Sequence, residues 1–134
     1  MVVLDASFVI AWAYKEAPPE LDSLMRQVVE DVACVPVHWL LEITNTLAIS
    51  ERRGKLLSGQ RQEILKTIKL LPIQTDDETW LHGWDAIPAL AERFGLTTYD
   101  AAYLELALRL DAPLATLDQD LARAARAAKV ALFQ

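Results

Sequence analysis

The stretch LTTYDAAYLELALRLDAPLATLDQDL, residues 96–121, decides the fold class of this chain. It predicts a helix over 97–111, a short apolar strand over 113–116 and a second helix over 118–130. A strand enclosed by two helices is typical of folds in which parallel strands are connected through helices. The stretch therefore indicates an α/β protein.

The same alternation extends through the rest of the chain. Further short strands are predicted over 2–4, 33–37, 72–75 and 130–133, with helices over 6–14, 18–32, 39–54, 58–71 and 76–95. We expect the last of these helices to be broken or kinked near Pro88 and to end at Gly95. Five short strands alternating with helices predict a five-stranded parallel sheet covered on both faces, a three-layer α/β/α sandwich in one domain over 1–134.

Composition bounds the class of protein. The chain has 134 residues, of which 53% are hydrophobic, so it can build a core and is not a disordered chain. It contains no apolar run of about 18 residues that would span a membrane, and its first residues lack the basic segment of a signal peptide. The single cysteine, Cys34, cannot form an internal disulfide and is expected to be buried. These features predict a cytoplasmic protein.

The charge of the chain is negative but unevenly distributed. A formal net charge of −6 argues against a general nucleic-acid coat. The segment 52–69 nevertheless carries six basic residues and one acid. It is either a solvated helix face or a patch that contacts a phosphate backbone or an acidic partner.

Acidic residues follow the predicted strands at the edge where parallel sheets bind ligands, beyond the carboxyl ends of the strands. Asp5 comes directly after the first strand, and Thr116 and Asp118 lie at and just past the fourth. Asp100 opens the helix before that strand, and Glu42 lies one turn into the helix after the second strand.

Most of these acids also have an interpretation as helix caps. Asp5 would cap the helix that follows it, and Asp100 would form a capping box with Thr97. Either Asp118 or Asp120 would cap the last helix.

Glu42 has no such explanation. Its neighbours Leu40, Leu41 and Ile43 are apolar, and a carboxylate buried in such a run needs a partner. Asn45, three residues further on, shares its helix face and offers an amide beside the carboxylate.

The acids would repel one another strongly if they converged. Two carboxylates about 4 Å apart repel by roughly 4 kcal/mol at an effective dielectric constant near 20. Such a group requires raised pKa values or a bound cation. No His or Cys accompanies the acids at motif spacing, which disfavours zinc, and an all-oxygen site suits Mg²⁺ or Mn²⁺. Sites of this kind activate water and stabilise phosphate oxygens.

Four short motifs carry a resemblance to a known family. They are VVLDAS (2–7), PVHWLLEITNTL (36–47), LTTYDAAYLELALRL (96–110) and PLATLDQDL (113–121). In order and spacing they resemble the PIN domain, and in length and motif wording the chain resembles the VapC toxins of bacterial toxin–antitoxin pairs.

The resemblance implies a fold and an activity. The sheet order would be 3-2-1-4-5, and the protein would be a metal-dependent endoribonuclease that hydrolyses transfer or ribosomal RNA and leaves 5′-phosphate and 3′-hydroxyl ends. Asp5, Glu42, Asp100 and Asp118 match the acidic quartet of the family and would hold Mg²⁺, with Mn²⁺ as an alternative.

The resemblance also implies roles for residues around the acids. Ser7, Asn45 and Thr116 would orient ligands or water. Asp118 is preferred over Asp120 as the fourth acid, which leaves Asp120 as a cap in the first turn of the last helix.

Several expectations concern partners. An antitoxin of the VapB type would cover the site with its C-terminal segment, and the toxin would be a homodimer. Arg52, Arg53 and Lys55 are the candidate RNA contacts of the basic segment. The tryptophans serve either an interface or the core; they are Trp12, Trp39, Trp80 and Trp84. His38 and His82 are expected to be structural.

Two rival functions fit the sequence less well than the nuclease does. A catalytically inert PIN-like module that binds RNA or protein is disfavoured because all four acids are present. A phosphoacceptor receiver domain would need paired acids after the first strand, where Asp5 stands alone, and a lysine after the fifth.

Overall fold

A short, buried β-strand near the N-terminus lies inside a parallel sheet. In the computed structural model, which describes residues 1–14 and 17–133, the strands are β1 (Val2–Leu4), β2 (Ala33–Val35), β3 (Ile73–Thr75) and β4 (Leu114–Ala115). Their order is β3-β2-β1-β4 and every pairing is parallel. Val3 lies opposite Cys34 on one side and Leu114 on the other, so the residue that follows β1 emerges between two neighbouring strands.

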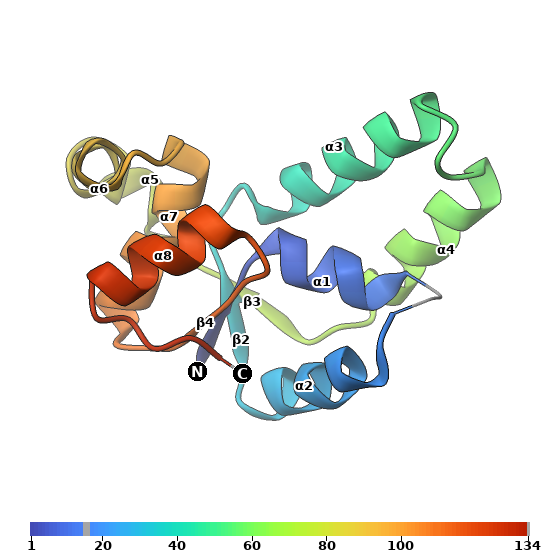
Figure 1. The fold of residues 1–134 in the computed structure, drawn as a ribbon, viewed down its shortest axis with the longest axis horizontal. Coiled ribbons are helices and arrows are strands. Elements are labelled where there is room, and N and C mark those ends of the chain that lie inside the picture. The colour runs from blue at the N-terminus through green and yellow to red at the C-terminus, as the bar shows by residue number, and fades with distance from the viewer. Residues whose placement is uncertain (15–16, 134) are drawn as a thin grey trace.

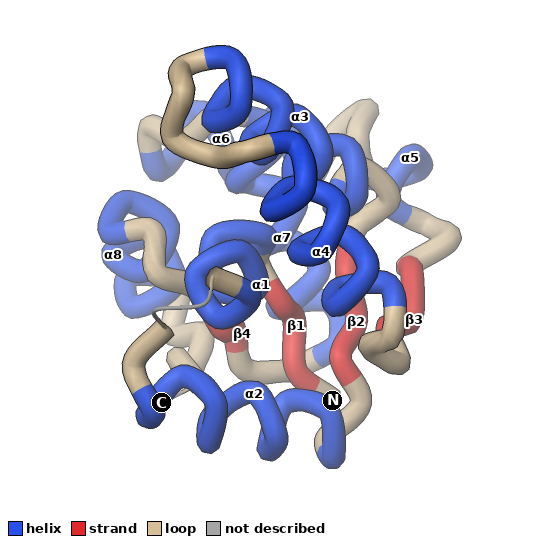
Figure 2. Tube along the Cα trace, turned by 90° about the vertical axis from the view of Figure 1, so that its right-hand side faces the viewer, coloured by secondary structure: helices blue, strands red, loops and turns tan. Residues whose placement is uncertain are grey.

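Helices cover both faces of this sheet. They are α1 (Ala6–Ala13), α2 (Pro19–Glu30), α3 (Trp39–Arg52), α4 (Ser58–Lys69), α5 (Thr79–His82), α6 (Ala86–Phe94), α7 (Thr98–Leu110) and α8 (Gln119–Ala127). Figure 1 shows α1 to α4 on one side of the strands and α5 to α8 on the other. Figure 2 shows the short strands enclosed by these helices. The α/β class and the parallel sheet are therefore as predicted.

The predicted fifth strand over 130–133 is wrong, and with it the order 3-2-1-4-5. Among the described residues, this segment makes a single parallel bridge between Leu132 and Leu114. The N–H of Leu114 donates to the carbonyl of Ala131, and the N–H of Phe133 donates to the carbonyl of Leu114. β4 uses both of its residues to pair with β1, but only Leu114 pairs with the segment on its other side.

The expected break near Pro88 lies elsewhere. Helix α5 ends at His82 and α6 begins at Ala86, so the chain leaves the helix before the proline and not at it. Pro88 is the third residue of α6, in the first turn, where backbone N–H groups have no partner within the helix and proline is tolerated. Gly95 ends α6 with a φ of 65°, as predicted.

The core is continuous across the sheet and its helices. β1 is fully buried, and Cys34 is buried as expected. Helix α7 contributes a run of buried residues, 101–107. Trp39 lies in the core, whereas Trp80 and Trp84 are 64% and 78% exposed and are not core residues. Within the described part of the chain, no helix has the length and apolarity needed to cross a membrane.

Candidate active site

Asp5 lies at the carboxyl end of β1 and is 3% exposed. It stands at the N-cap position of α1, but its side chain accepts no capping hydrogen bond. Its Oδ2 accepts instead from Ser7 Oγ and Thr116 Oγ1, each at 2.6 Å. Among the described residues no hydrogen bond reaches Oδ1, so this oxygen is left for another ligand.

The acidity of Asp5 reflects its surroundings. Burial raises the pKa of Asp5 from 3.8 to about 6, although both hydroxyl donors lower it. The negative charges of Glu42 and Asp100 raise it further. Three of the four predicted acids thus lie close enough to influence one another.

Glu42 is held by two partners that sequence analysis did not assign to the site. The hydroxyl of Tyr103 donates to Glu42 Oε1 at 2.6 Å, and His38 Nε2 lies 3.1 Å from the same oxygen and 3.0 Å from the carbonyl oxygen of Tyr99. Glu42 is not enclosed by its apolar neighbours, because Leu40 and Leu41 are 53% and 70% exposed. The partner that a carboxylate needs comes from α7 and from the residue before α3.

Tyr103 is the more informative of these two residues. It is fully buried, and burial together with the charges of Asp5 and Glu42 raises the pKa of its hydroxyl far above the usual value. The hydroxyl is therefore a permanent donor toward the acids. A signal for it was present in the sequence, since Tyr103 follows Asp100 by three residues and shares a helix face with it.

Asp100 lies in the first turn of α7, which is capped by Thr97. The N–H of Asp100 donates to Thr97 Oγ1 at 3.1 Å, so the threonine is the cap and the carboxylate is not. Burial raises the pKa of Asp100, and the charges of Asp118 and Glu42 add to this shift. Asp100 therefore connects Asp118 to the other acids electrostatically.

The assignment of Asp120 as the cap of the last helix is wrong. Asp118 is the N-cap of α8, and its Oδ2 accepts from the N–H of Leu121 at 2.8 Å. Asp120 is exposed in the first turn and pairs with Arg123 at 3.2 Å. Asp118 thus combines the two interpretations that the sequence had separated, since it caps a helix and also lies near Asp100.

Hydroxyl groups connect the first and fourth strand ends. The two hydroxyls that donate to Asp5 also accept from backbone N–H groups near β4. Thr116 Oγ1 accepts from the N–H of Asp118 at 3.0 Å, and Ser7 Oγ accepts from the N–H of Leu117 at 3.1 Å. Asn45 behaves differently. It is exposed on α3, and among the described residues it makes no side-chain hydrogen bond to the acids.

The donor set fits a hard divalent cation. It consists of carboxylate and hydroxyl oxygens, which Mg²⁺ and Mn²⁺ prefer, and among the described residues buried Asp5 has hydroxyl donors but no cationic partner. No three of the four acids, however, have oxygens that all lie within 4.8 Å of one another. In the described chain, the group of three that does is Asp76, Asp77 and Glu78.

That second acidic group is committed to an ion pair. Arg109 donates to both oxygens of Asp76, at 3.1 and 2.7 Å, and Thr79 Oγ1 donates to one of them. Burial raises the pKa of Asp76, but the hydrogen bonds from Arg109 and Thr79 outweigh this effect and the pKa is lowered. Asp76 therefore has its counter-charge already.

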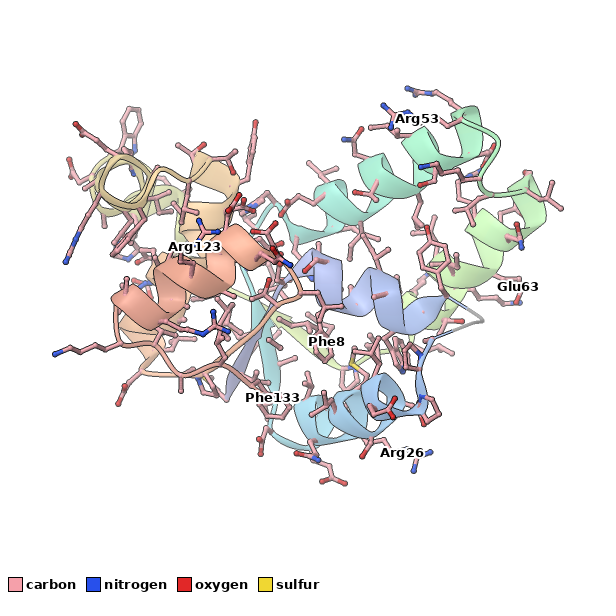
Figure 3. All side chains as sticks on the ribbon, in the orientation of Figure 1. Phe8, Arg26, Arg53, Glu63, Arg123 and Phe133 are labelled. Carbon is pink, nitrogen blue, oxygen red and sulfur yellow. The ribbon has the colours of Figure 1, made fainter. Side chains whose placement is uncertain are left out.

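The basic segment lies away from the acids. Arg52 and Arg53 lie at the end of α3, and Lys55 in the turn to α4. Ten residues of helix separate Arg52 from Glu42, about 15 Å at 1.5 Å per residue. Figure 3 shows Arg53 at the tip of the α3–α4 hairpin.

Comparison with known proteins places this geometry in a family. The sequence profile of the PIN domain matches residues 2–127. Ribonuclease VapC3 of Pyrobaculum aerophilum is 31% identical over 130 residues, covering 90% of this chain and 92% of that protein.

Solved structures share the fold. FitAcB from Neisseria gonorrhoeae superimposes with a TM-score of 0.69 at 15% identity, over 100% of this chain and 97% of that one. VapBC2 from Rickettsia felis, bound to a DNA fragment from its promoter, gives a TM-score of 0.63 at 16% identity, over 92% of each chain.

Proposed function

This chain belongs to the PIN domain family, and we propose that it is a metal-dependent endoribonuclease of the VapC type, the toxin of a toxin–antitoxin module. The observation that carries the proposal is buried Asp5, whose carboxylate lies near Glu42 and Asp100, with Asp118 beside Asp100. A relative that is a ribonuclease and is matched over nearly its whole length supports it.

We propose that the four acids hold Mg²⁺, with Mn²⁺ as an alternative. When bound, the ion would supply the positive charge that makes a water molecule nucleophilic at neutral pH and that stabilises phosphate oxygens. Asp5 would be a fixed ligand, because Ser7 and Thr116 hold its Oδ2 and leave Oδ1 toward the ion.

The reaction would be hydrolysis of an RNA phosphodiester. The oxygen of water forms a bond to phosphorus while the bond to the 3′-oxygen breaks, which leaves 5′-phosphate and 3′-hydroxyl ends. Glu42 and Asp118 are our candidates for accepting the proton of the water. Tyr103 and His38 would keep Glu42 in place, and the cap bond to Leu121 would do the same for Asp118.

The similarity to VapC ribonucleases supports a proposal for the substrate and the partners. We propose that the chain cuts transfer or ribosomal RNA, that it works as a homodimer, and that the C-terminal segment of a VapB-type antitoxin covers the acids. A basic side chain from the antitoxin would supply the counter-charge that Asp5 lacks. The similarity in fold to VapBC2, an assembly of two components, supports the antitoxin.

The test is cleavage of total RNA by the purified chain with Mg²⁺, with Mn²⁺ and with EDTA. We expect discrete fragments that need the metal and that disappear in Asp100→Asn. Asp120→Asn is the matched control, because it removes the same charge from an exposed acid on α8.

Two outcomes would overturn the proposal. Absence of cleavage in either metal would favour an inert PIN-like binding module. Cleavage that survives Asp100→Asn, or that Asp120→Asn abolishes equally, would exclude Asp100 from a specific role.

A further inference from the structure

A cavity of about 480 Å³ opens beside the acids, between α8 and the segment that follows it. Thr116 and Asp118 line both this cavity and the acidic site, so the two spaces share a wall. Arg123 and Arg126 line it from α8, and Phe133 lines it from the segment that follows α8. Figure 3 shows Arg123 on α8 and Phe133 on the segment after that helix.

We propose that this cavity binds a nucleotide of the RNA strand next to the phosphodiester that is cut. The inference rests on the proposed nuclease function and adds a subsite that the acids alone do not provide. The volume of the cavity lies within the range of about 300–1,000 Å³ found for small-molecule sites.

The helix face that lines the cavity is suited to a phosphate. Four residues of α8 line the cavity, and they lie three, one and three positions apart, which places them on one face of the helix: Gln119, Ala122, Arg123 and Arg126. The opposite face, with Leu121, Ala124 and Ala125, is buried in the core. Packing therefore fixes the orientation in which α8 presents its two arginines.

The positive charge of Arg123 and Arg126 on this face of α8 would attract the phosphates of an RNA strand beside the acidic site. Arginine pairs with phosphate oxygens through two parallel hydrogen bonds. Asp118 is the one acid among the described residues that line the cavity, and no acid in the described chain lies within ion-pair distance of Arg126. Arg123 pairs with Asp120, but both side chains are more than two-thirds exposed, so phosphate can displace that contact.

The apolar side chains of the lining are suited to a base. Leu117, Leu132 and Phe133 also line the cavity, and the ring of Phe133 offers a stacking surface that does not depend on base identity. The lining thus combines cationic and apolar side chains, which match the two ends of a nucleotide. A purely acidic or purely apolar peptide would match only one of them.

The test uses the full chain with Asp100→Asn, which binds RNA without cutting it if the proposed function holds. Arg123→Gln, alone and with Arg126→Gln, is compared with Arg26→Gln on α2, which matches the single variant because it also loses one charge and one exposed ion pair within a helix. The probe is a short fluorescein-labelled single-stranded RNA of mixed sequence, followed by fluorescence anisotropy in Mg²⁺ at several salt concentrations.

We expect the double arginine substitution to raise the Kd for RNA on the order of tenfold or more. It should also flatten the dependence of log Kd on log salt by about 0.7 for each lost phosphate contact. Arg26→Gln should leave both quantities unchanged. Equal binding by the double variant, or an equal loss in Arg26→Gln, would overturn the subsite.

Ultraviolet cross-linking of the same RNA carrying 4-thiouridine locates the base. We expect a cross-linked peptide that contains Phe133, lost in the double variant and retained in Arg26→Gln. Cross-links that avoid this peptide would contradict the inference.

The results also distinguish the subsite from the nuclease function. If the chain with Asp100 intact cuts RNA while the arginine substitutions change nothing, only the subsite fails. If the chain neither binds nor cuts RNA, the nuclease function fails as well.

Discussion

The carboxylate of Asp5 is ionised at neutral pH at a cost in stability. Its pKa is raised by burial from 3.8 in the unfolded chain to about 6, so the folded state binds this proton more tightly. Between about pH 4 and pH 6 the contribution of Asp5 to the free energy of unfolding therefore falls as pH rises, and above that window the full penalty remains.

Asp5→Asn should remove that penalty while keeping an oxygen that accepts from Ser7 and Thr116. In EDTA at about pH 7.5, we expect a free energy of unfolding higher by on the order of 2 kcal/mol than that of the wild type, with the difference vanishing near pH 4. Urea unfolding at both pH values measures this. A variant that is less stable at about pH 7.5 would show that ionised Asp5 is compensated in the absence of metal.

The hydroxyl of Tyr103 is a second residue with a measurable role. Tyr103→Phe keeps the buried ring and removes the donor that holds Glu42. We expect kcat for RNA cleavage to fall about 10- to 100-fold with little change in KM, and the affinity for Mn²⁺ measured by electron paramagnetic resonance to weaken. An unchanged kcat together with an unchanged Mn²⁺ affinity would make Tyr103 a packing residue only.

At the scale of elements, the start of α8 carries both a structural and a chemical duty through Asp118. Asp118→Asn retains a side-chain oxygen for the N–H of Leu121, whereas Asp118→Ala loses it. We expect both variants to lose RNA cleavage, and only the alanine variant to lose about 1 kcal/mol of stability. If the asparagine variant cleaves like the wild type, Asp118 is a cap and nothing more.

The helices and strands show which features a sequence pattern can specify. Gly95 ends α6 as predicted, because a position with a φ of 65° favours glycine. This requirement is local, so the sequence alone reveals it. The fifth strand was predicted wrongly, and the break expected near Pro88 lies at 83–85, before the proline, because both features depend on context. Proline is excluded from helix interiors but tolerated in a first turn, and a strand needs a neighbour long enough to pair with it.

In the candidate site, too, local features could be predicted from the sequence and contacts between distant residues could not. The positions of Asp5 and Asp118 at strand ends could be predicted, since parallel strands deliver their carboxyl ends to one edge. The contact of Tyr103 with Glu42 could not, because it joins α7 to α3 across 61 positions of the chain. The contact of His38 with Glu42 is local, four residues apart at the start of α3, and its spacing was visible in the sequence. Asn45 shows the limit of helix-face arguments, because one turn from Glu42 the side chain already faces solvent.

At the scale of the whole molecule, an ion pair joins the end of β3 to α7. Arg109 contacts Asp76 at 2.7 Å and Glu105 at 2.8 Å, and both acids are buried. One arginine thus faces two buried carboxylates, whereas among the described residues no arginine or lysine pairs with Asp5. The molecule therefore has two acidic centres at the same end of the sheet, one that holds an arginine and one that does not.

Arg109→Met should leave Asp76 and Glu105 buried without a counter-charge and cost about 3 kcal/mol of stability. Thermal unfolding measures the loss. At a temperature where the variant remains folded, RNA cleavage should be retained, because the ion pair holds the scaffold and not the substrate. Full loss of cleavage in a folded Arg109→Met protein would connect this network to the chemistry.

The proposed function depends on four acids, Asp5, Glu42, Asp100 and Asp118, holding the divalent ion. The most direct measurement is a crystal structure of the chain with Mn²⁺, located by its anomalous scattering. We predict a peak within bonding distance of Asp5 Oδ1 and Asp100, surrounded by the other two acids. A peak at Asp76, Asp77 and Glu78 instead, or an acidic site that stays empty at saturating Mn²⁺, would contradict the account.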